Sequence, residues 1–199
     1  MKITNEDNMD LMSRYKDNYF DLAIVDPPFG IHDRMLGSKR MGQQDTTWNK
    51  NIPNSDYFKE LFRVSKNQII WGANYYANFL PNERDWIVWD KMQGDLGFSM
   101  HELAWTSFNK VPKIVRMQTI RGHIQRLHPC EKPVKLYEWL LYNYANEGDK
   151  VLDTHLGSGS IAIAAHNLAY DLTACEIDKE YYNLAIKRIE QHKKQIRIF

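Results

Sequence analysis

Short apolar runs alternate with longer amphipathic segments along most of this chain. The apolar runs, rich in β-branched and aromatic residues, predict strands at 20–25, 68–72, 85–91, 101–108, 151–153 and 171–178. Apolar residues at helical spacing predict helices at 9–15, 55–65, 74–81, 132–145, 160–170 and 179–195. Ser55 suits the N-cap of the second of these helices, and Pro133 suits a position near the start of the fourth.

This alternation predicts an α/β fold in one domain, residues 1–199, with a Rossmann-like, doubly wound, mostly parallel sheet and helices on both faces. Ligands bind such folds at the carboxyl ends of the strands. Unusual residues gather there, at 26–29, 153–160 and 176–178. The pattern breaks between 30 and 53, where the sequence is polar and punctuated by glycine, and a loop that long predicts a mobile active-site segment.

Composition adds little, because 43% hydrophobic and 26% charged residues with a net charge of +1 are ordinary for a soluble globular protein. Neither cysteine matches a metal spacing, so we expect free thiols and no metal. The polar amino terminus lacks the apolar core of a signal peptide, and no segment approaches the roughly 18 apolar residues of a membrane span. We therefore expect a cytoplasmic protein without a membrane partner.

The distribution of charge is more informative than its total. The stretch between Glu102 and Glu131 contains no acidic residue, and it contains five basic ones, Lys110, Lys113, Arg116, Arg121 and Arg126. Such a block can mark a phosphate-rich partner, or it can be a solvated loop whose counter-charges lie elsewhere in space.

The segment VLDTHLGSGS predicts a strand that ends at Asp153 and turns through Gly157 and Gly159 into a helix. Glycines in that place let the backbone approach a ligand, although many such turns need glycine for packing alone. Glu176 and Asp178 follow about 20 residues later, at the end of the next strand, where an acid typically binds ribose hydroxyls. The spacing fits a nucleoside ligand, either a dinucleotide or an adenosine-containing cofactor.

The segment LAIVDPPFG ends a strand on Asp26, Pro27, Pro28 and Phe29. The prolines stiffen the backbone, so the Asp26 carboxylate and the Pro27 carbonyl can point to one place, beside the flat ring of Phe29. Two acceptors and a stacking plane suit an exocyclic amino group on a planar base. A strand-terminating turn is the simpler alternative for the tetrapeptide alone.

Together, DPPF, HPCEKP and DTHLGSGS in this order resemble the S-adenosylmethionine-dependent amino-methyltransferases of DNA, in the motif order of their β group. The resemblance extends over nearly the whole chain and is strongest to short, phage-type members. It implies a class I methyltransferase fold with permuted motif order, S-adenosylmethionine as cofactor, and duplex DNA with a flipped base as partner. It leaves a homodimer open.

The resemblance also assigns roles to residues. Asp26, Pro27, Pro28 and Phe29 would hold the target base, with Asp26 also near the cofactor. The residues that would contact the cofactor are Lys132, Pro133, Asp153, His155, Gly157, Ser158, Gly159, Ser160, Glu176, Ile177 and Asp178. His128 is a further position that matches the HPCEKP motif.

Two departures from the family pattern change the expectations. His155 stands where the family usually has an aromatic residue, and Thr154 where it often has proline. The sizeable target-recognition insert of the family is reduced here to a short basic segment, 109–127, which predicts relaxed sequence specificity or a need for a second subunit. The residues expected to contact DNA are Lys110, Lys113, Arg116, Arg121 and Arg126 in that segment, and Arg34, Lys39 and Arg40 in the 30–53 loop, where Trp48 can serve as an anchor.

The leading hypothesis is methylation of adenine N6, because Asp26 stands where the cytosine-N4 enzymes of the family that the chain resembles often have serine. Cytosine N4 is the alternative within the class. An RNA or protein-glutamine methyltransferase can use the same Asp-Pro-Pro motif to hold an amino group, but its motifs do not occur in this order. A catalytically idle DNA-binding protein on the same fold is a further alternative, and a Rossmann-type dehydrogenase leaves DPPF unexplained.

Overall fold

The computed structural model describes residues 1–31, 49–94, 99–119 and 130–195. Its strands form a single eight-stranded sheet in the order β1-β8-β7-β2-β3-β5-β4-β6. The strands are β1 Lys2–Asn5, β2 Phe20–Val25, β3 Ser65–Trp71, β4 Trp86–Asp90, β5 His101–Thr106, β6 Lys113–Arg116, β7 Lys150–Asp153 and β8 Asp171–Glu176. All of them run parallel except β5, which is antiparallel to both of its neighbours.

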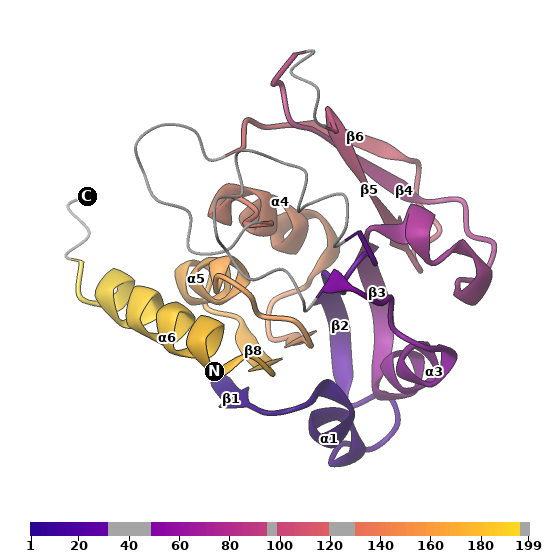
Figure 1. Ribbon diagram of the computed structural model, residues 1–199. Helices are drawn as coiled ribbons and strands as arrows, with labels where there is room; N and C mark the ends of the chain where they lie inside the picture. Colours follow the sequence, from indigo (N-terminus) through magenta and orange to yellow (C-terminus); the bar gives the residue numbers. More distant parts are fainter. Residues whose placement is uncertain (32–48, 95–98, 120–129, 196–199) are drawn as a thin grey trace.

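Helices cover both faces of the sheet, as Figure 1 shows. They are α1 Asn8–Ser13, α3 Ser55–Val64, α4 Val134–Tyr144, α5 Ser160–Asn167 and α6 Lys179–Lys193, with the 3-10 turns η2 Ala73–Tyr75 and η3 Ala77–Phe79. None of the helices in the described part of the chain is long and apolar enough to cross a membrane. The predicted mostly parallel α/β fold is confirmed.

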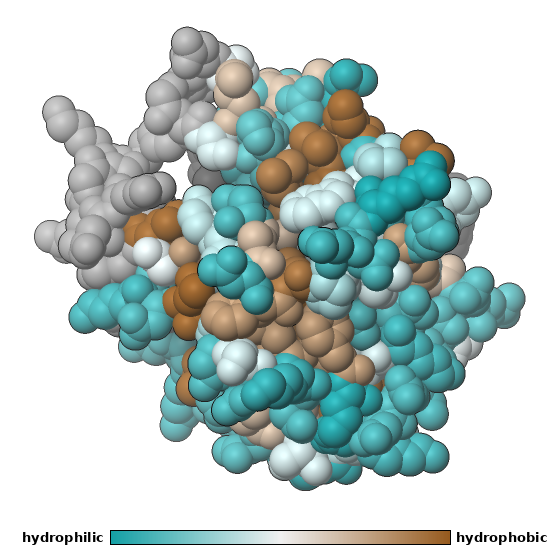
Figure 2. All heavy atoms as spheres, turned by 90° about the vertical axis from the view of Figure 1, so that its right-hand side faces the viewer, coloured by the Kyte–Doolittle hydropathy of each residue, from teal (hydrophilic) through white to brown (hydrophobic). Residues whose placement is uncertain are grey.

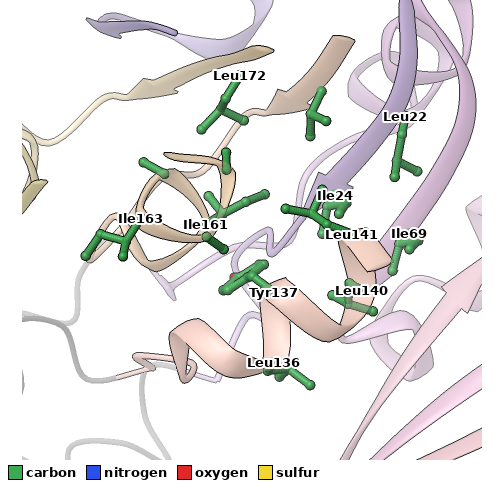
Figure 3. Close-up of a cluster of buried hydrophobic side chains, with 14 of the residues drawn as sticks. Leu22, Ile24, Ile69, Leu136, Tyr137, Leu140, Leu141, Ile161, Ile163 and Leu172 are labelled. Atoms are coloured by element: carbon green, nitrogen blue, oxygen red, sulfur yellow. The ribbon is translucent and has the colours of Figure 1, made fainter. Parts of the chain in front are cut away.

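Alternation along the strands builds a core on each face of the sheet. Leu22 and Ile24 of β2 face α4, α5 and α6, whereas Ala23 and Val25 face α1 and α3. Figure 3 shows the first of these clusters, in which side chains of α4 and α5 meet those of the central strands. Because both faces of β2 are buried, its ends are the parts of the strand at which polar side chains can meet a ligand.

Several predicted boundaries need correction. The N-cap of α3 is Asn54, whose side chain accepts from the N–H groups of Asp56 and Tyr57, and not Ser55. β3 begins at Ser65, inside the segment predicted as the end of a helix. β1 and β6 were not predicted, because four-residue strands with few apolar residues carry too little pattern.

The outer surface around β4 to β6 carries a few exposed apolar side chains. Figure 2 shows hydrophobic residues among hydrophilic ones on the side that carries α3 and β4. Val111 and Ile114, at and beside the edge strand β6, are 65% and 59% exposed. Singly exposed apolar residues of this kind are normal for a folded domain.

Candidate functional site at the carboxyl edge of the sheet

The DPPF segment directly follows β2 and is held by groups far away in the sequence. The hydroxyl of buried Tyr76 donates to the carbonyl oxygens of Pro27 (2.6 Å) and Pro28 (2.7 Å). The Asn49 side-chain oxygen accepts from the backbone N–H of Phe29 (2.7 Å) and of Gly30 (3.0 Å). The prolines therefore restrict the backbone, and Tyr76 and Asn49 fix its direction.

The ring of Phe29 lies directly against Gly72, which follows β3. A Cβ atom added at Gly72 would lie 2.2 Å from Cε1 of the Phe29 ring. The backbone at this position also has a positive φ of +71°, which residues other than glycine rarely adopt. The Tyr75 ring stacks on Phe29 with 5.2 Å between the centroids and 10° between the planes. Gly72 therefore provides the space for the Phe29 ring, and Tyr75 stacks on that ring.

Asp26 forms an ion pair with Lys132, which precedes α4. Lys132 Nζ lies 2.5 Å from Asp26 Oδ2 and 3.0 Å from Oε2 of Glu102. Burial raises the pKa of Asp26, and the Lys132 ammonium opposes that rise. Burial also disfavours the charge on Lys132, but the two carboxylates raise its pKa above the usual range. For Glu102, burial is outweighed by Lys132 and Lys91, and its pKa falls to about 2.

The turn after β7 is stabilised by a chain of hydrogen bonds through His155. An N–H of the Asn8 side chain donates to Nε2 of His155 (3.2 Å), so Nδ1 carries the proton and donates to Thr154 Oγ1 (2.9 Å). Tyr57 OH shares a further hydrogen bond with Thr154 Oγ1 (2.7 Å). Burial lowers the pKa of His155 to about 3, so this histidine is neutral.

Glu176 ends β8 and reaches toward the glycine turn. Its Oε2 accepts from the N–H of Gly157 (2.8 Å), and its Oε1 accepts from the N–H of Asp178 (3.0 Å). Each carboxylate oxygen has a second lone pair for a ligand hydroxyl. Glu176 therefore connects the glycine turn after β7 with the acidic end of β8, the two segments that the sequence predicted to bind a nucleoside.

A cavity of about 470 Å³ lies between these segments. Its walls come from the start of α1, the end of β2, the residues before α3, the segment before α4, the turn after β7 and the end of β8. This volume is within the range of small-molecule cofactor sites, and Asp26 and Glu176 both line it. The site thus combines space for a nucleoside-containing cofactor with the DPPF segment.

Comparison with known proteins identifies the family. A family model described as N6_N4_Mtase, DNA methylase, matches residues 70–187, more than half of the chain. The chain belongs to the N6/N4 DNA methylase family. Enzymes of this family are DNA methyltransferases, and S-adenosylmethionine is their cofactor.

Individual relatives agree with this assignment. The chain is 28% identical to the type II methyltransferase M.HpaI of Haemophilus parainfluenzae, over 90% of this chain and 71% of that protein. It is 36% identical to the type II methyltransferase M2.DpnII of Streptococcus pneumoniae, over 72% of this chain and 49% of that protein. The chain therefore spans about half to seven tenths of the length of these relatives.

Solved DNA methylase structures share the fold at low identity. The M1.HpyAVI–SAM complex superimposes with a TM-score of 0.64 and 19% identity, covering 94% of this chain and 98% of that one. The PvuII DNA methyltransferase, cytosine-N4-specific, superimposes with a TM-score of 0.66 and 13% identity, covering 96% and 89%.

Most residues expected to contact the methylase cofactor line the cavity. These are Asp26, Lys132, His155, Gly157, Ser158, Ser160, Glu176, Ile177 and Asp178. Asp178 also has a structural role, because its Oδ1 accepts from the N–H groups of Glu180 and Tyr181 as the N-cap of α6.

Three other expected cofactor contacts are not among the residues that line the cavity. Asp153 is buried and accepts from the N–H of His155 (3.0 Å), which stabilises the turn. A Cβ atom added at Gly159 would meet Ile189 of α6 at 3.2 Å, so this glycine allows helix packing. Pro133 is the N-cap of α4.

The residues expected to contact DNA divide into three groups. Lys110 and Lys113 hydrogen-bond to Asn143 near the end of α4, at the edge of the sheet opposite the cavity. Arg116 lies at the carboxyl edge, 3.5 Å from Asp90 in an exposed ion pair. Arg34, Lys39, Arg40, Arg121 and Arg126 lie outside the described residues, as do the loop residue Trp48 and the motif residue His128.

Several residues of the site were not predicted from the sequence. Asn8, Tyr57 and Tyr137 line the cavity, and Tyr76 and Asn49 hold the DPPF backbone. Asn and Tyr are common in turns and cores, so nothing in their own surroundings marks them. The short helix predicted over 74–81 is instead two 3-10 turns, η2 and η3, with Tyr76 between them, and the prediction did not indicate what the Tyr76 hydroxyl binds.

Proposed function

We propose that this chain transfers the methyl group of S-adenosylmethionine to the exocyclic N6 amino group of adenine in DNA, with the base flipped into a pocket formed by the DPPF segment. One observation carries the proposal. Asp26 Oδ1 is buried and has no hydrogen-bond partner among the described residues, although Asp26 lines the cavity. A buried acceptor without a donor is costly, and the N–H of a bound substrate amine removes that cost.

The neighbouring groups supply what such an amine needs. The Pro27 carbonyl accepts from Tyr76 OH and keeps a second lone pair for the second N–H of the amine. Hydrogen bonds to both N–H groups localise the nitrogen lone pair, which is otherwise delocalised into the ring. Holding that lone pair in line with the methyl group supplies much of the acceleration in a transfer of this kind.

The residues of the cavity fit S-adenosylmethionine, which supplies a methyl group on a positively charged sulfur. Glu176 has free lone pairs for ribose hydroxyls, and Gly157 at a positive φ leaves its turn open to the methionine portion. Ile177 is 65% exposed at the wall of the cavity, where an apolar side chain suits the adenine ring. His155, neutral and hydrogen-bonded, supplies a flat face in place of the usual aromatic residue.

Adenine is preferred to cytosine because Asp26 occupies the position at which cytosine-N4 enzymes often carry serine. The same two acceptors also fit the N4 amine of cytosine, which is the second candidate. We further propose that the short 109–127 segment gives a short or relaxed recognition sequence, or one completed by a second subunit.

Three measurements test these proposals. S-adenosylmethionine is expected to raise the melting temperature of the chain, and NAD is not; no stabilisation by S-adenosylmethionine would contradict the cofactor site. Tritiated S-adenosylmethionine and plasmid from unmethylated cells, followed by digestion to nucleosides, are expected to give labelled N6-methyladenine. Label in N4-methylcytosine would move the proposal to the second candidate, and methylation-sensitive sequencing of the same DNA would give the recognised sequence.

A further inference from the structure

Four segments of the chain bring a line of alternating charges into the site. Asp26 follows β2, Lys132 precedes α4, Glu102 lies on β5, and Lys91 follows β4. Successive N–O distances along the line are 2.5 Å, 3.0 Å and 2.5 Å. Their side chains are 16%, 2%, 20% and 12% exposed, so water screens these charges poorly.

The two oxygens of Asp26 differ in their surroundings. Oδ2 accepts from the Lys132 ammonium, whereas Oδ1 has no hydrogen-bond partner among the described residues. The single lysine restrains one oxygen of the carboxylate and leaves the other oxygen for a substrate. An ionised carboxylate is also a stronger acceptor than a neutral one.

Lys132 is held in place from both sides. Its neighbour Glu131 pairs with Arg188 of α6 at 2.8 Å, and Arg188 also donates to the Ser158 carbonyl in the glycine turn. The ammonium lies over the ring of Trp71 at 5.2 Å from the centroid. Lys132 lines the cavity, but these contacts hold its ammonium at Asp26.

We infer that Lys132 is a positioning residue that keeps Asp26 ionised with Oδ1 free for the target amine, and that Glu102 is a second carboxylate that shares the Lys132 charge. This inference rests on the proposed function and deepens it. It also changes the expected role of Lys132, from a contact of the cofactor to a contact of the catalytic carboxylate.

The charge balance of the cluster explains why Lys132 is needed. With all four groups ionised the cluster is neutral, and loss of the Lys132 charge leaves two buried carboxylates with only Lys91. Like charges in a buried site drive one of them to bind a proton. Other groups that interact with the Asp26 charge are Asp153, Tyr57, Tyr76, Tyr137 and Cys130.

Carbon NMR of the unliganded chain, labelled at the aspartate carboxyl carbons, measures this ionisation without any methyl transfer. The spectrum of Asp26→Asn assigns the Asp26 resonance. We expect Lys132→Met to raise the Asp26 midpoint by roughly one to three pH units. Lys132→Arg keeps the charge and should leave the midpoint within about one unit of the wild type.

Glu102→Gln is the deciding variant if Lys132→Met does not fold. It removes a negative neighbour, so the Asp26 midpoint should fall, and the Lys132→Met, Glu102→Gln double variant should lie between the wild type and Lys132→Met. A purely structural role would lower the melting temperatures and leave these midpoints unchanged. An Asp26 midpoint within about 0.3 unit of the wild type in Lys132→Met, or a rise in Glu102→Gln, would overturn the inference.

The acid limb of the methyl-transfer rate should move in the same direction as the NMR midpoint in each variant, so Lys132→Met should regain activity at higher pH. Lys66→Met is the matched control, because Lys66 pairs with Asp21 at the opposite end of β2 (2.7 Å). It should leave the Asp26 midpoint unchanged. Absence of transfer by the wild type would refute the proposed function, whereas wild-type transfer with unmoved midpoints would refute only the role of Lys132.

Discussion

Strand β2 has an aspartate at each end, and each aspartate pairs with a lysine. Asp21 lies 2.7 Å from Lys66, and Asp26 lies 2.5 Å from Lys132. The lysines are 54% and 2% exposed, respectively. Two ion pairs of the same chemistry and similar length thus sit at opposite edges of one sheet, one in water and one in the interior.

The two carboxylates respond to this difference in opposite ways. Both oxygens of Asp21 have partners, because Oδ2 accepts from the N–H of Lys150 (2.9 Å), and this bond together with Lys66 lowers the pKa of Asp21. Burial raises the pKa of Asp26, and one of its oxygens is unpaired among the described residues. A satisfied exposed pair is what a stable surface needs, whereas an unsatisfied buried one indicates a site for a ligand.

The largest expected difference between the two ends is in activity. Asp26→Ala should reduce methyl transfer by at least about 10²-fold, because the amine loses its strongest acceptor. The heat-shift with S-adenosylmethionine should be largely retained. Asp21→Ala is the matched control and should keep its transfer rate. Activity that survives Asp26→Ala would contradict the catalytic role of this residue.

A glycine at each edge gives a second comparison. Gly72→Ala places a Cβ atom 2.2 Å from the Phe29 ring, whereas Gly148→Ala, between α4 and β7, meets nothing within 4 Å. Both glycines have positive φ, so both variants carry a strain of roughly 1 kcal/mol. Displacement of Phe29 should cost Gly72→Ala a further ~1–3 kcal/mol of unfolding free energy and most of its activity.

Urea unfolding and label transfer by the two glycine variants check this expectation. Equal losses of stability in both, with activity retained in Gly72→Ala, would show that Phe29 needs no fixed position.

The carbonyls of the DPPF segment provide a third, smaller effect. Tyr76→Phe removes the hydroxyl that donates to Pro27 and Pro28, which should cost about 1–3 kcal/mol of stability. We expect kcat to fall about tenfold, equivalent to about 1.4 kcal/mol, with little change in the KM for S-adenosylmethionine. Tyr75→Phe is the control, because the hydroxyl of Tyr75 has no hydrogen bond among the described residues. A fall in KM or kcat of the same size in both variants would argue against a specific role of the Tyr76 hydroxyl.

The comparison also explains which parts of the site the sequence could predict. Asp26 and Glu176 were predicted because they follow or end a strand, and Gly157 because it lies in the glycine-rich turn after β7. Tyr76 and Asn49 were not, because their roles arise from contacts with a segment distant in sequence. Lys132 was found through its motif, but the motif does not indicate which partner its ammonium binds.

Glu102 was missed for a different reason. It lies near the start of β5, and in an all-parallel sheet that would place it at the edge opposite Asp26. Because β5 runs antiparallel to β3 and β4, its start lies at the carboxyl edge of the other strands. Strand direction depends on tertiary pairing, and the hydrophobic pattern of a short strand does not encode it.

A final comparison concerns stability and pH, and its expected effect is the smallest. Asp153 ends β7 at the carboxyl edge, and burial raises its pKa to about 8. Between its ordinary pKa and about 8 the folded chain holds a proton that the unfolded chain releases. Proton binding by Asp153 therefore makes the free energy of unfolding fall as pH rises, by up to about 1.4 kcal/mol per pH unit.

Asp153→Asn removes this proton binding and keeps an oxygen that accepts from the His155 N–H. The difference in melting temperature between this variant and the wild type should therefore increase from about pH 5 to about pH 8. Asp21 has the opposite sign, because its lowered pKa stabilises the fold above the unfolded pKa and that stability is lost in acid. Asp21→Asn should therefore be less stable than wild type by up to about 1 kcal/mol across the same pH range, without a trend. Melting curves at several pH values check both expectations. A difference in melting temperature between Asp153→Asn and the wild type that does not change with pH would mean that Asp153 is already ionised in the folded chain. Burial at the carboxyl edge would then not govern the charge of Asp153.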